Sequence, residues 1–275
     1  MIQEDSSSEP RPLGANVASL GLSNKPVFAV EEAEVKEEKS ESFEAPKPAD
    51  PVFLTRPPFE EELLQSTLWP EIQKLYGHGN YAFCVTSSWS GDLLATAVRA
   101  KSDADQATIR LWETKTWKEV ANLRAHKLTI TQLRFSHSDL YLLSSGRDRQ
   151  FSLFHRPALD QPFTLVAKQA KAHERIIWGC DWTPDDKYFV TASRDKLCKV
   201  WNVAESHQPI LFGSFSPAKV GITAVAFAPL QVSLNNEDKE KVYLLAVGLE
   251  NGLMQVWTFR KGSPEFSCLL HVPPK

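Results

Sequence analysis

The sequence predicts an all-β protein built from a repeated unit of short antiparallel strands. A dipeptide, Gly-His or Ala-His, recurs at 77–78, 125–126 and 172–173, and a degenerate Pro-Ala follows at 217–218. The second members of these pairs are 48, 47 and 45 residues apart. An aromatic residue recurs later in each unit, at Trp112, Phe154, Trp201 and Trp257. A period of about 40–50 residues with a tryptophan on the third strand is typical of a β-propeller.

Residues 172–202 show the unit most clearly. β-Branched, aromatic and other apolar residues fill 176–182, 188–192 and 197–203. A Thr-Pro-Asp-Asp sequence separates the first two runs, and an Arg-Asp-Lys sequence separates the last two. Short β runs broken by such turn residues predict a three-stranded meander.

Four polar or indole side chains interrupt these strands at positions that a meander brings together: His173, Thr191, Asp195 and Trp201. An imidazole can donate to a carboxylate and accept from a hydroxyl, and the hydroxyl can accept from an indole N–H. All buried polar atoms are then satisfied. The set resembles the structural tetrad of WD repeats. The alternative role, His173 as a general base, lacks a nucleophile at the required spacing.

The tetrad becomes less complete in the other repeats. The second repeat has His126, Ser144 and Asp148, but Phe154 replaces the tryptophan. The first has His78, Thr96 and Trp112, with Asp103 or Asp105 as the turn acid. The fourth keeps only Trp257, with Ala218, Val247 and Asn251 at the other positions. Losing one partner of a buried network costs roughly 1–3 kcal/mol, whereas losing two together is close to neutral.

The expected organisation has three parts. Residues 1–50 hold 11 acidic and 5 basic residues and form a mostly disordered acidic leader, although 13–30 is apolar enough to lie on a surface or join a sheet edge. Residues 51–76 form a linker, with a short helix at 59–66 and, at 69–76, the outer strand of a preceding blade. Residues 77–275 form a partial WD-repeat propeller. Its four-stranded sheets, or blades, are expected at about 77–124, 125–171, 172–216 and 217–275.

Long turns explain the uneven spacing of the repeats. Residues 98–107 extend the second turn of the first blade, and residues 229–241 extend the first turn of the fourth. Residues 266–274 read as an outer strand. WD-type propellers usually close with seven blades, so about four blades predict a piece, isoform or truncated form of a larger propeller.

Composition excludes several classes of protein. The charged fraction is 24%, the hydrophobic fraction is 42% and the net charge is −3, which gives no bulk attraction to nucleic acid. None of the cysteines, at 84, 180, 198 and 268, forms a C-x-x-C pair, so we expect no metal, no cofactor and reduced thiols inside the cell. The first residues lack the apolar core of a signal peptide, and no apolar run reaches the ~20 residues that span a bilayer.

Several segments resemble one family of WD-repeat proteins, the Elongator subunit 2 family, in its second propeller. They lie at 20–28, 63–79, 107–120, 125–136, 142–154 and 173–196, and the sequence Leu-Trp-Pro-Glu before the first Gly-His is the most specific. The similarity runs from about residue 13 to about residue 259. The chain departs from the family by lacking a first propeller and a closing blade.

The resemblance implies a non-catalytic scaffold that joins the large scaffold subunit of Elongator to the catalytic subunit, which modifies wobble uridines of tRNA. It also implies a historical connection with transcription elongation, and a cytoplasmic and nuclear location. The expected partners are therefore other Elongator subunits, with tRNA contact indirect, no membrane and no small-molecule substrate. The alternative is a generic WD-repeat adaptor, either a ubiquitin-ligase receptor or a chromatin-associated protein.

Candidate partner contacts lie on the propeller face formed by second turns and by the starts of first strands: Arg147, Arg175, Trp178 and Arg194. Exposed Arg and Trp are typical of binding hot spots, although surface arginines also pair with nearby acids. Basic residues at 168, 171, 187, 196 and 199 are expected to be scattered, which gives little support for direct RNA binding. The acids at 181, 185, 186 and 195 are assigned to turns and to the tetrad, so a hydrolase site is not expected.

Overall fold

The computed structural model of the chain describes residues 14–17, 24–27, 73–100, 107–203, 206–229 and 242–274. Strands β1 (Gly14–Val17) and β2 (Asn24–Val27) form an antiparallel pair with each other, in a unit that covers Met1–Tyr76. The helix expected at 59–66 and the first half of the outer strand expected at 69–76 lie outside the described residues. Residues 73–76 are described and are not in a strand, so that part of the expectation is wrong.

Four four-stranded antiparallel sheets form the second unit, Gly77–Lys275. The first sheet contains β3 (Ala82–Ser87), β4 (Leu93–Val98), β5 (Thr108–Glu113) and β6 (Glu119–Arg124). The second contains β7 (Ile130–Phe135), β8 (Tyr141–Gly146), β9 (Phe151–His155) and β10 (Thr164–Gln169). The third contains β11 (Ile177–Trp182), β12 (Tyr188–Ser193), β13 (Cys198–Val203) and β14 (Pro209–Phe215). The fourth contains β15 (Ile222–Phe227), β16 (Val242–Leu249), β17 (Met254–Arg260) and β18 (Ser263–Val272).

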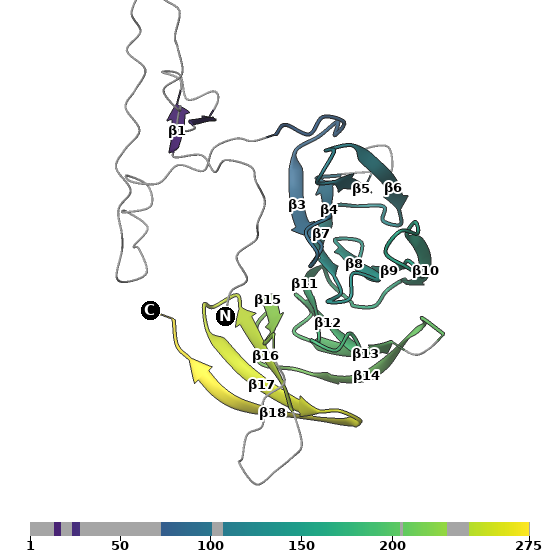
Figure 1. Ribbon diagram of the computed structural model, residues 1–275. Coiled ribbons are helices and arrows are strands. Elements are labelled where there is room, and N and C mark those ends of the chain that lie inside the picture. Colours follow the sequence, from purple (N-terminus) through teal and green to yellow (C-terminus); the bar gives the residue numbers. More distant parts are fainter. Residues whose placement is uncertain are drawn as a thin grey trace, which may run out of the picture. The chain divides into compact units, whose positions relative to one another are not determined.

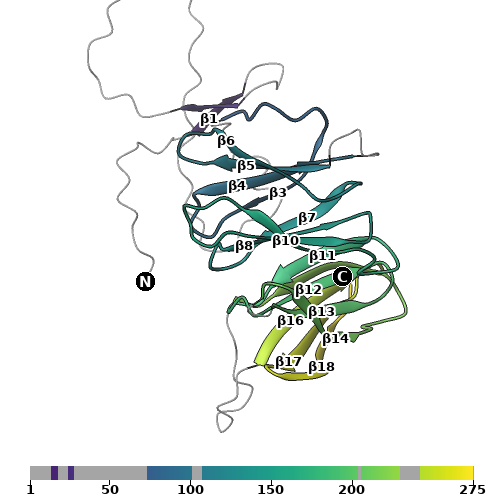
Figure 2. The ribbon, with the colours of Figure 1, turned by 90° about the vertical axis from the view of Figure 1, so that its right-hand side faces the viewer.

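Each sheet is a simple meander whose strands follow one another in sequence order. The first strands, β3, β7, β11 and β15, are neighbours and lie along the inner side of an arc, while β6, β10, β14 and β18 form the outer edges (Figure 1). Seen from the side, the sheets stack one upon the next (Figure 2). The prediction of an all-β, propeller-like fold with four blades is confirmed.

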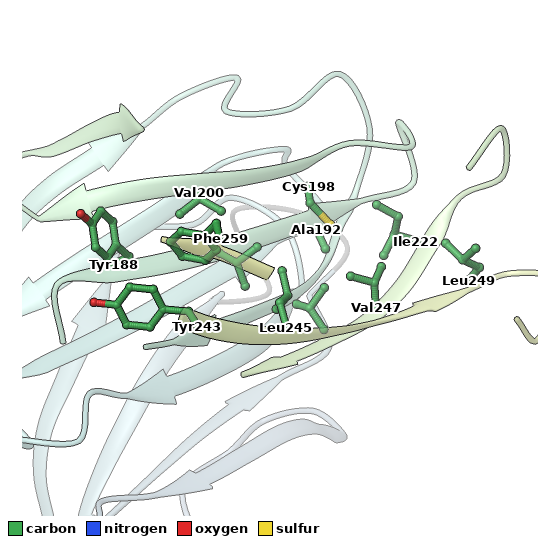
Figure 3. Packing of buried hydrophobic residues seen from close by; sticks show 12 residues of the cluster. Tyr188, Ala192, Cys198, Val200, Ile222, Tyr243, Leu245, Val247, Leu249 and Phe259 are labelled. Atoms are coloured by element: carbon green, nitrogen blue, oxygen red, sulfur yellow. The ribbon is translucent and has the colours of Figure 1, made fainter. Parts of the chain in front are cut away.

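The hydrophobic core is divided among the boundaries between adjacent sheets. One cluster joins the first and second sheets, a second joins the second and third, and a third joins the third and fourth. At the last boundary Tyr188 and Val200 face Tyr243, Leu245 and Phe259 (Figure 3). Fully burying each large apolar side chain contributes roughly 1.5–3 kcal/mol, so sheet-on-sheet contact is the main force that stabilises the stack.

Aspartates at the first turns connect neighbouring sheets. The carboxylate of Asp139 accepts hydrogen bonds from the backbone nitrogens of Trp89 and Ser90, at 2.7 and 2.8 Å. One sheet further on, Asp186 accepts from His137 and Ser138 at the same two distances. Both aspartates have left-handed backbones, with φ of 59° and 57°. These carboxylates therefore fix each first turn against the turn of the preceding sheet.

Side chains on the first strands make similar connections. Asp181 accepts from the backbone nitrogen of Phe227 in the next sheet at 2.7 Å, and Gln132 accepts from that of Cys180 at 2.9 Å. Asp181 was assigned to a turn or to the tetrad from sequence. That assignment is wrong, because Asp181 lies within β11 and contacts the fourth sheet. Asp185 does lie in a turn, and it accepts a hydrogen bond from the Tyr243 hydroxyl at 2.7 Å.

One face of the first sheet is exposed. Val85 on β3 is 63% exposed, whereas Leu133, Cys180 and Val225, which occupy the same place in the following sheets, are at most 5% exposed. Each of those three packs against the sheet before it. Phe83, on the same strand, is 45% exposed. The first sheet therefore presents to solvent the surface that the other three bury.

Candidate interaction site

The third blade contains a complete network of four side chains. His173 Nδ1 lies 2.9 Å from Asp195 Oδ2, and His173 Nε2 lies 2.8 Å from Thr191 Oγ1. Trp201 Nε1 donates to the same hydroxyl at 2.9 Å. Since the indole can only donate, the Thr191 hydroxyl accepts from Trp201 and donates to Nε2, and Nδ1–H then donates to the carboxylate. The structure thus brings together all four residues at the geometry of a closed hydrogen-bond chain.

The carboxylate at the end of this chain is held in its ionised form. Burial opposes the charge of Asp195, but the hydrogen bond from His173 and those from the backbone nitrogens of Glu174 and Leu197 outweigh it. The pKa of Asp195 therefore lies below its ordinary value. A carboxyl group with a lower pKa in the folded state stabilises the fold above the pKa of the unfolded chain, near 4. This contribution disappears as the pH falls through the folded-state pKa.

We expect Asp195→Asn to lower the free energy of unfolding by about 2 kcal/mol at pH 7, because hydrogen bonds to a charged group are stronger than those to an amide. The difference between variant and wild type should shrink as the pH falls from about 4 through the lower folded-state pKa, where the wild-type carboxylate becomes protonated. Urea unfolding measured from pH 3 to pH 7 checks both statements. Asp160→Asn, at an exposed position, is the control and should leave the curve unchanged. A difference that stays constant with pH would contradict the assignment.

The second blade closes its network differently. His126 Nδ1 lies 3.1 Å from Asp148 Oδ1, and His126 Nε2 lies 2.9 Å from Ser144 Oγ. Phe154, where the third blade has Trp201, is 1% exposed and has no polar group to satisfy. Gln150 adds a donor that the sequence did not reveal, because its Nε2 bonds Asp148 Oδ2 at 2.5 Å and the Ala125 carbonyl at 2.9 Å.

The first blade has the histidine, hydroxyl and indole in place. His78 Nε2 lies 2.8 Å from Thr96 Oγ1, and Trp112 Nε1 donates to the same oxygen at 2.8 Å. The candidate turn acids of this blade, at 103 and 105, lie outside the described residues. Burial, with a smaller contribution from the charge of Arg110, lowers the pKa of His78. The imidazole is therefore held neutral, as its role as an acceptor requires.

In the fourth blade the indole N–H has a different acceptor. Trp257 Nε1 donates to Gln255 Oε1 at 2.9 Å. Val247 is fully buried and Ala218 packs against the apolar cluster, so the two lost tetrad positions have become part of the core. Gln255 was missed from sequence because it precedes the tryptophan by two residues on the same strand, where no member of the tetrad is expected.

The four candidate partner contacts lie near the tetrad end of the blades but differ in accessibility. Arg147 and Arg175 are exposed, and Trp178 is half-buried on β11. Arg194 is exposed as well, but its Nε lies 3.0 Å from Glu250 Oε1 in the turn of the next blade. An exposed pair of this kind contributes little to stability. Arg147 and Arg175, for which the described residues supply no ion pair, are therefore the arginines most available to a partner.

The cysteines and acids of the described region form no cluster suited to a metal ion. Cys180 and Cys198 are fully buried, all four cysteines are free thiols, and burial raises the pKa of Cys180 to about 12. No group of three or more His, Cys, Asp or Glu within the described ranges is placed to hold a metal ion. No helix of the described residues is long and apolar enough to cross a membrane.

Comparison with known proteins identifies the repeat. Residues 117–155 and 164–202, which cover parts of all but the fourth blade, match the family described as WD domain, G-beta repeat. Elongator complex protein 2 of Homo sapiens is 43% identical over 282 residues, which cover 94% of this chain and 33% of that protein. The chain contains WD repeats and is similar, over nearly its whole length, to part of Elongator complex protein 2.

Two further relatives have the same name. Elongator complex protein 2 of Dictyostelium discoideum is 38% identical over 99% of this chain and 35% of that protein, and that of Arabidopsis thaliana is 41% identical over 92% and 30%. The family resemblance noted from sequence is confirmed. The chain spans about a third of the length of these Elongator relatives.

Proposed function

We propose that this chain acts as a non-catalytic scaffold within an Elongator assembly, where it joins the large scaffold subunit to the catalytic subunit. In that role it supports modification of wobble uridines in tRNA without itself carrying out a reaction, in the cytoplasm and the nucleus. The observation that carries the proposal is the set of relatives named Elongator complex protein 2, which align over nearly the whole chain.

The use of the polar side chains supports a scaffold over an enzyme. The histidines at 78, 126 and 173 each bond a hydroxyl, and two of them also bond a carboxylate. Both ring nitrogens of His126 and His173, and one ring nitrogen of His78, are therefore occupied by structural partners. A general base needs a free nitrogen within reach of a substrate proton. The described tetrads therefore serve to rigidify the blades, and rigid blades suit a surface that positions other proteins.

The surface of second turns is the part of this scaffold that we assign to partner contact. Arg147 and Arg175 present guanidinium groups there that form no ion pair with the described residues, and Trp178 follows Arg175 by three residues in sequence. Arginine and tryptophan dominate the energy of many protein interfaces. Arg194 belongs to the same surface but must exchange its partner Glu250 for a new one, so we expect it to contribute less.

The double variant Arg147→Glu/Arg175→Glu should weaken binding to other Elongator subunits while the fold stays intact. Each hot-spot residue contributes about 2 kcal/mol, or roughly 30-fold in affinity. Affinity purification of the tagged full chain from cells, with quantitative mass spectrometry, measures the recovery of those subunits. Lys115→Glu, an exposed lysine in the β5–β6 turn, makes a charge change of the same sign as control.

Unchanged recovery of all subunits with the double variant would remove this surface from the interface. Recovery of ubiquitin-ligase or chromatin proteins in place of Elongator subunits, by the wild-type chain, would instead favour a generic WD-repeat adaptor. Loss of recovery with the Lys115→Glu control would show that net charge, rather than these two arginines, controls binding.

A further inference from the structure

A hollow of about 280 Å³ lies where the first and second sheets meet. Arg124 at the end of β6, Lys127 in the loop before β7 and Lys168 on β10 line it. From sequence, Lys168 was counted among scattered basic residues. The structure places it beside two other cations, so that description is wrong for this residue.

The positive charge of this hollow is not neutralised from within. Among the described residues, no acid lines it and none forms an ion pair with any of the three cations. All three are exposed to solvent. Like charges held in one concave site raise the local electrostatic potential and attract anions.

The neighbouring polar groups are already satisfied. His126, which also lines the hollow, has one ring nitrogen on Asp148 and the other on Ser144. Asp148 accepts from His126, from the backbone nitrogen of Lys127 and from Gln150. The nearby carboxylate is thus held by the tetrad of the second blade, and the side chains of Arg124, Lys127 and Lys168 remain available for a ligand.

The geometry points to a site for a phosphorylated serine or threonine side chain on a protein partner, a property beyond the proposed scaffold function and independent of it. A phosphate monoester carries a charge of about −1.5 to −2 and three strong acceptor oxygens, which match the three cations that line the hollow. A carboxylate carries one charge and two oxygens, and would leave the third cation unpaired.

The surroundings of the hollow favour a peptide over a nucleic acid. β6 and β10 are the outer strands of their sheets, so each has backbone groups with no neighbouring strand, and an extended peptide can pair with such an edge. A nucleic acid strand needs cations that continue along its backbone. Lys199 does not supply a further cation of this kind, because its Nζ donates to the Ala172 carbonyl at 2.6 Å.

The test compares two degenerate peptide pools on the immobilised full chain, one with a central phosphoserine and one with serine. We expect the phosphoserine pool to be retained at least tenfold more strongly, and inorganic phosphate to displace it better than chloride at equal ionic strength. The variant Lys127→Gln/Lys168→Gln should reduce retention at least tenfold. Lys115→Gln/Lys219→Gln, with the same change in net charge at two other exposed lysines, should change it less than twofold.

Equal retention of the two pools would overturn the proposal, as would equal losses in the test and control variants. A labelled oligouridine distinguishes the nucleic acid alternative: if it binds the same hollow more tightly than the phosphoserine pool, and loses binding in the test variant, the site serves a nucleic acid backbone. Near-ultraviolet circular dichroism confirms that the variants fold. Subunit recovery from cells is a separate readout, so failure here leaves the scaffold proposal standing.

Discussion

Replacing Thr191 by valine is expected to lower the free energy of unfolding by about 3 kcal/mol. Valine keeps the shape of threonine but removes the hydroxyl, which accepts from Trp201 and donates to His173. Thr191 is fully buried and His173 is 1% exposed, so water cannot replace the lost partner. Each buried polar group left unsatisfied costs roughly 1–3 kcal/mol. Urea unfolding followed by tryptophan fluorescence measures the loss.

The matched control is Thr223→Val, on an exposed position of β15. Exposed substitutions of this kind change stability by about 0.5 kcal/mol or less. The double variant Thr191→Val/Trp201→Phe should lose less free energy of unfolding than the sum of the two single variants. The reason is that Trp201→Phe removes an indole N–H that Thr191→Val has already left without an acceptor. Strict additivity would show that the two side chains do not interact.

Phe189→Ala should lower the free energy of unfolding still further, by roughly 3–5 kcal/mol, the range for truncating a buried aromatic residue. Phe189 is fully buried, and its ring centroid lies 5.2 Å from those of both Phe151 and Trp182. Phe151 belongs to the second sheet and Trp182 to the third. The truncation therefore leaves a cavity at the boundary between two sheets, where rigid backbones on both sides limit collapse.

Phe83→Ala is the same chemical change at a ring that is 45% exposed on the open face of the first sheet. Its expected cost is about 1 kcal/mol or less, because truncation there opens no enclosed cavity. Thermal unfolding of the two variants side by side gives the comparison. Equal losses would mean that the boundary between the second and third sheets is no better packed than the open face.

The repeat period and the strand pattern were readable from sequence. The runs at 176–182, 188–192 and 197–203 correspond to β11, β12 and β13 within one residue at each end. The partners of His173 were also recoverable, because hydroxyl, carboxylate and indole each fall at a position that a meander fixes. Local spacing carries this information, since the first turn of a meander sets the register of the next strand.

Contacts between sheets could not be predicted from the sequence. Asp139 reaches Trp89 and Asp186 reaches His137 across about 50 residues, and neither strand periodicity nor turn chemistry indicates which turns will be neighbours. Asp181 was misassigned for the same reason. The gathering of Arg124, Lys127 and Lys168 likewise depends on how two sheets meet.

The exposed face of β3 has a consequence for how the chain responds to stress. In the described region the second and third sheets are sandwiched between neighbours, whereas Val85 and Phe83 are open to water. A sheet with fewer apolar contacts opens at a lower free energy. We therefore expect local unfolding to begin at the first sheet and to reach the second and third sheets last.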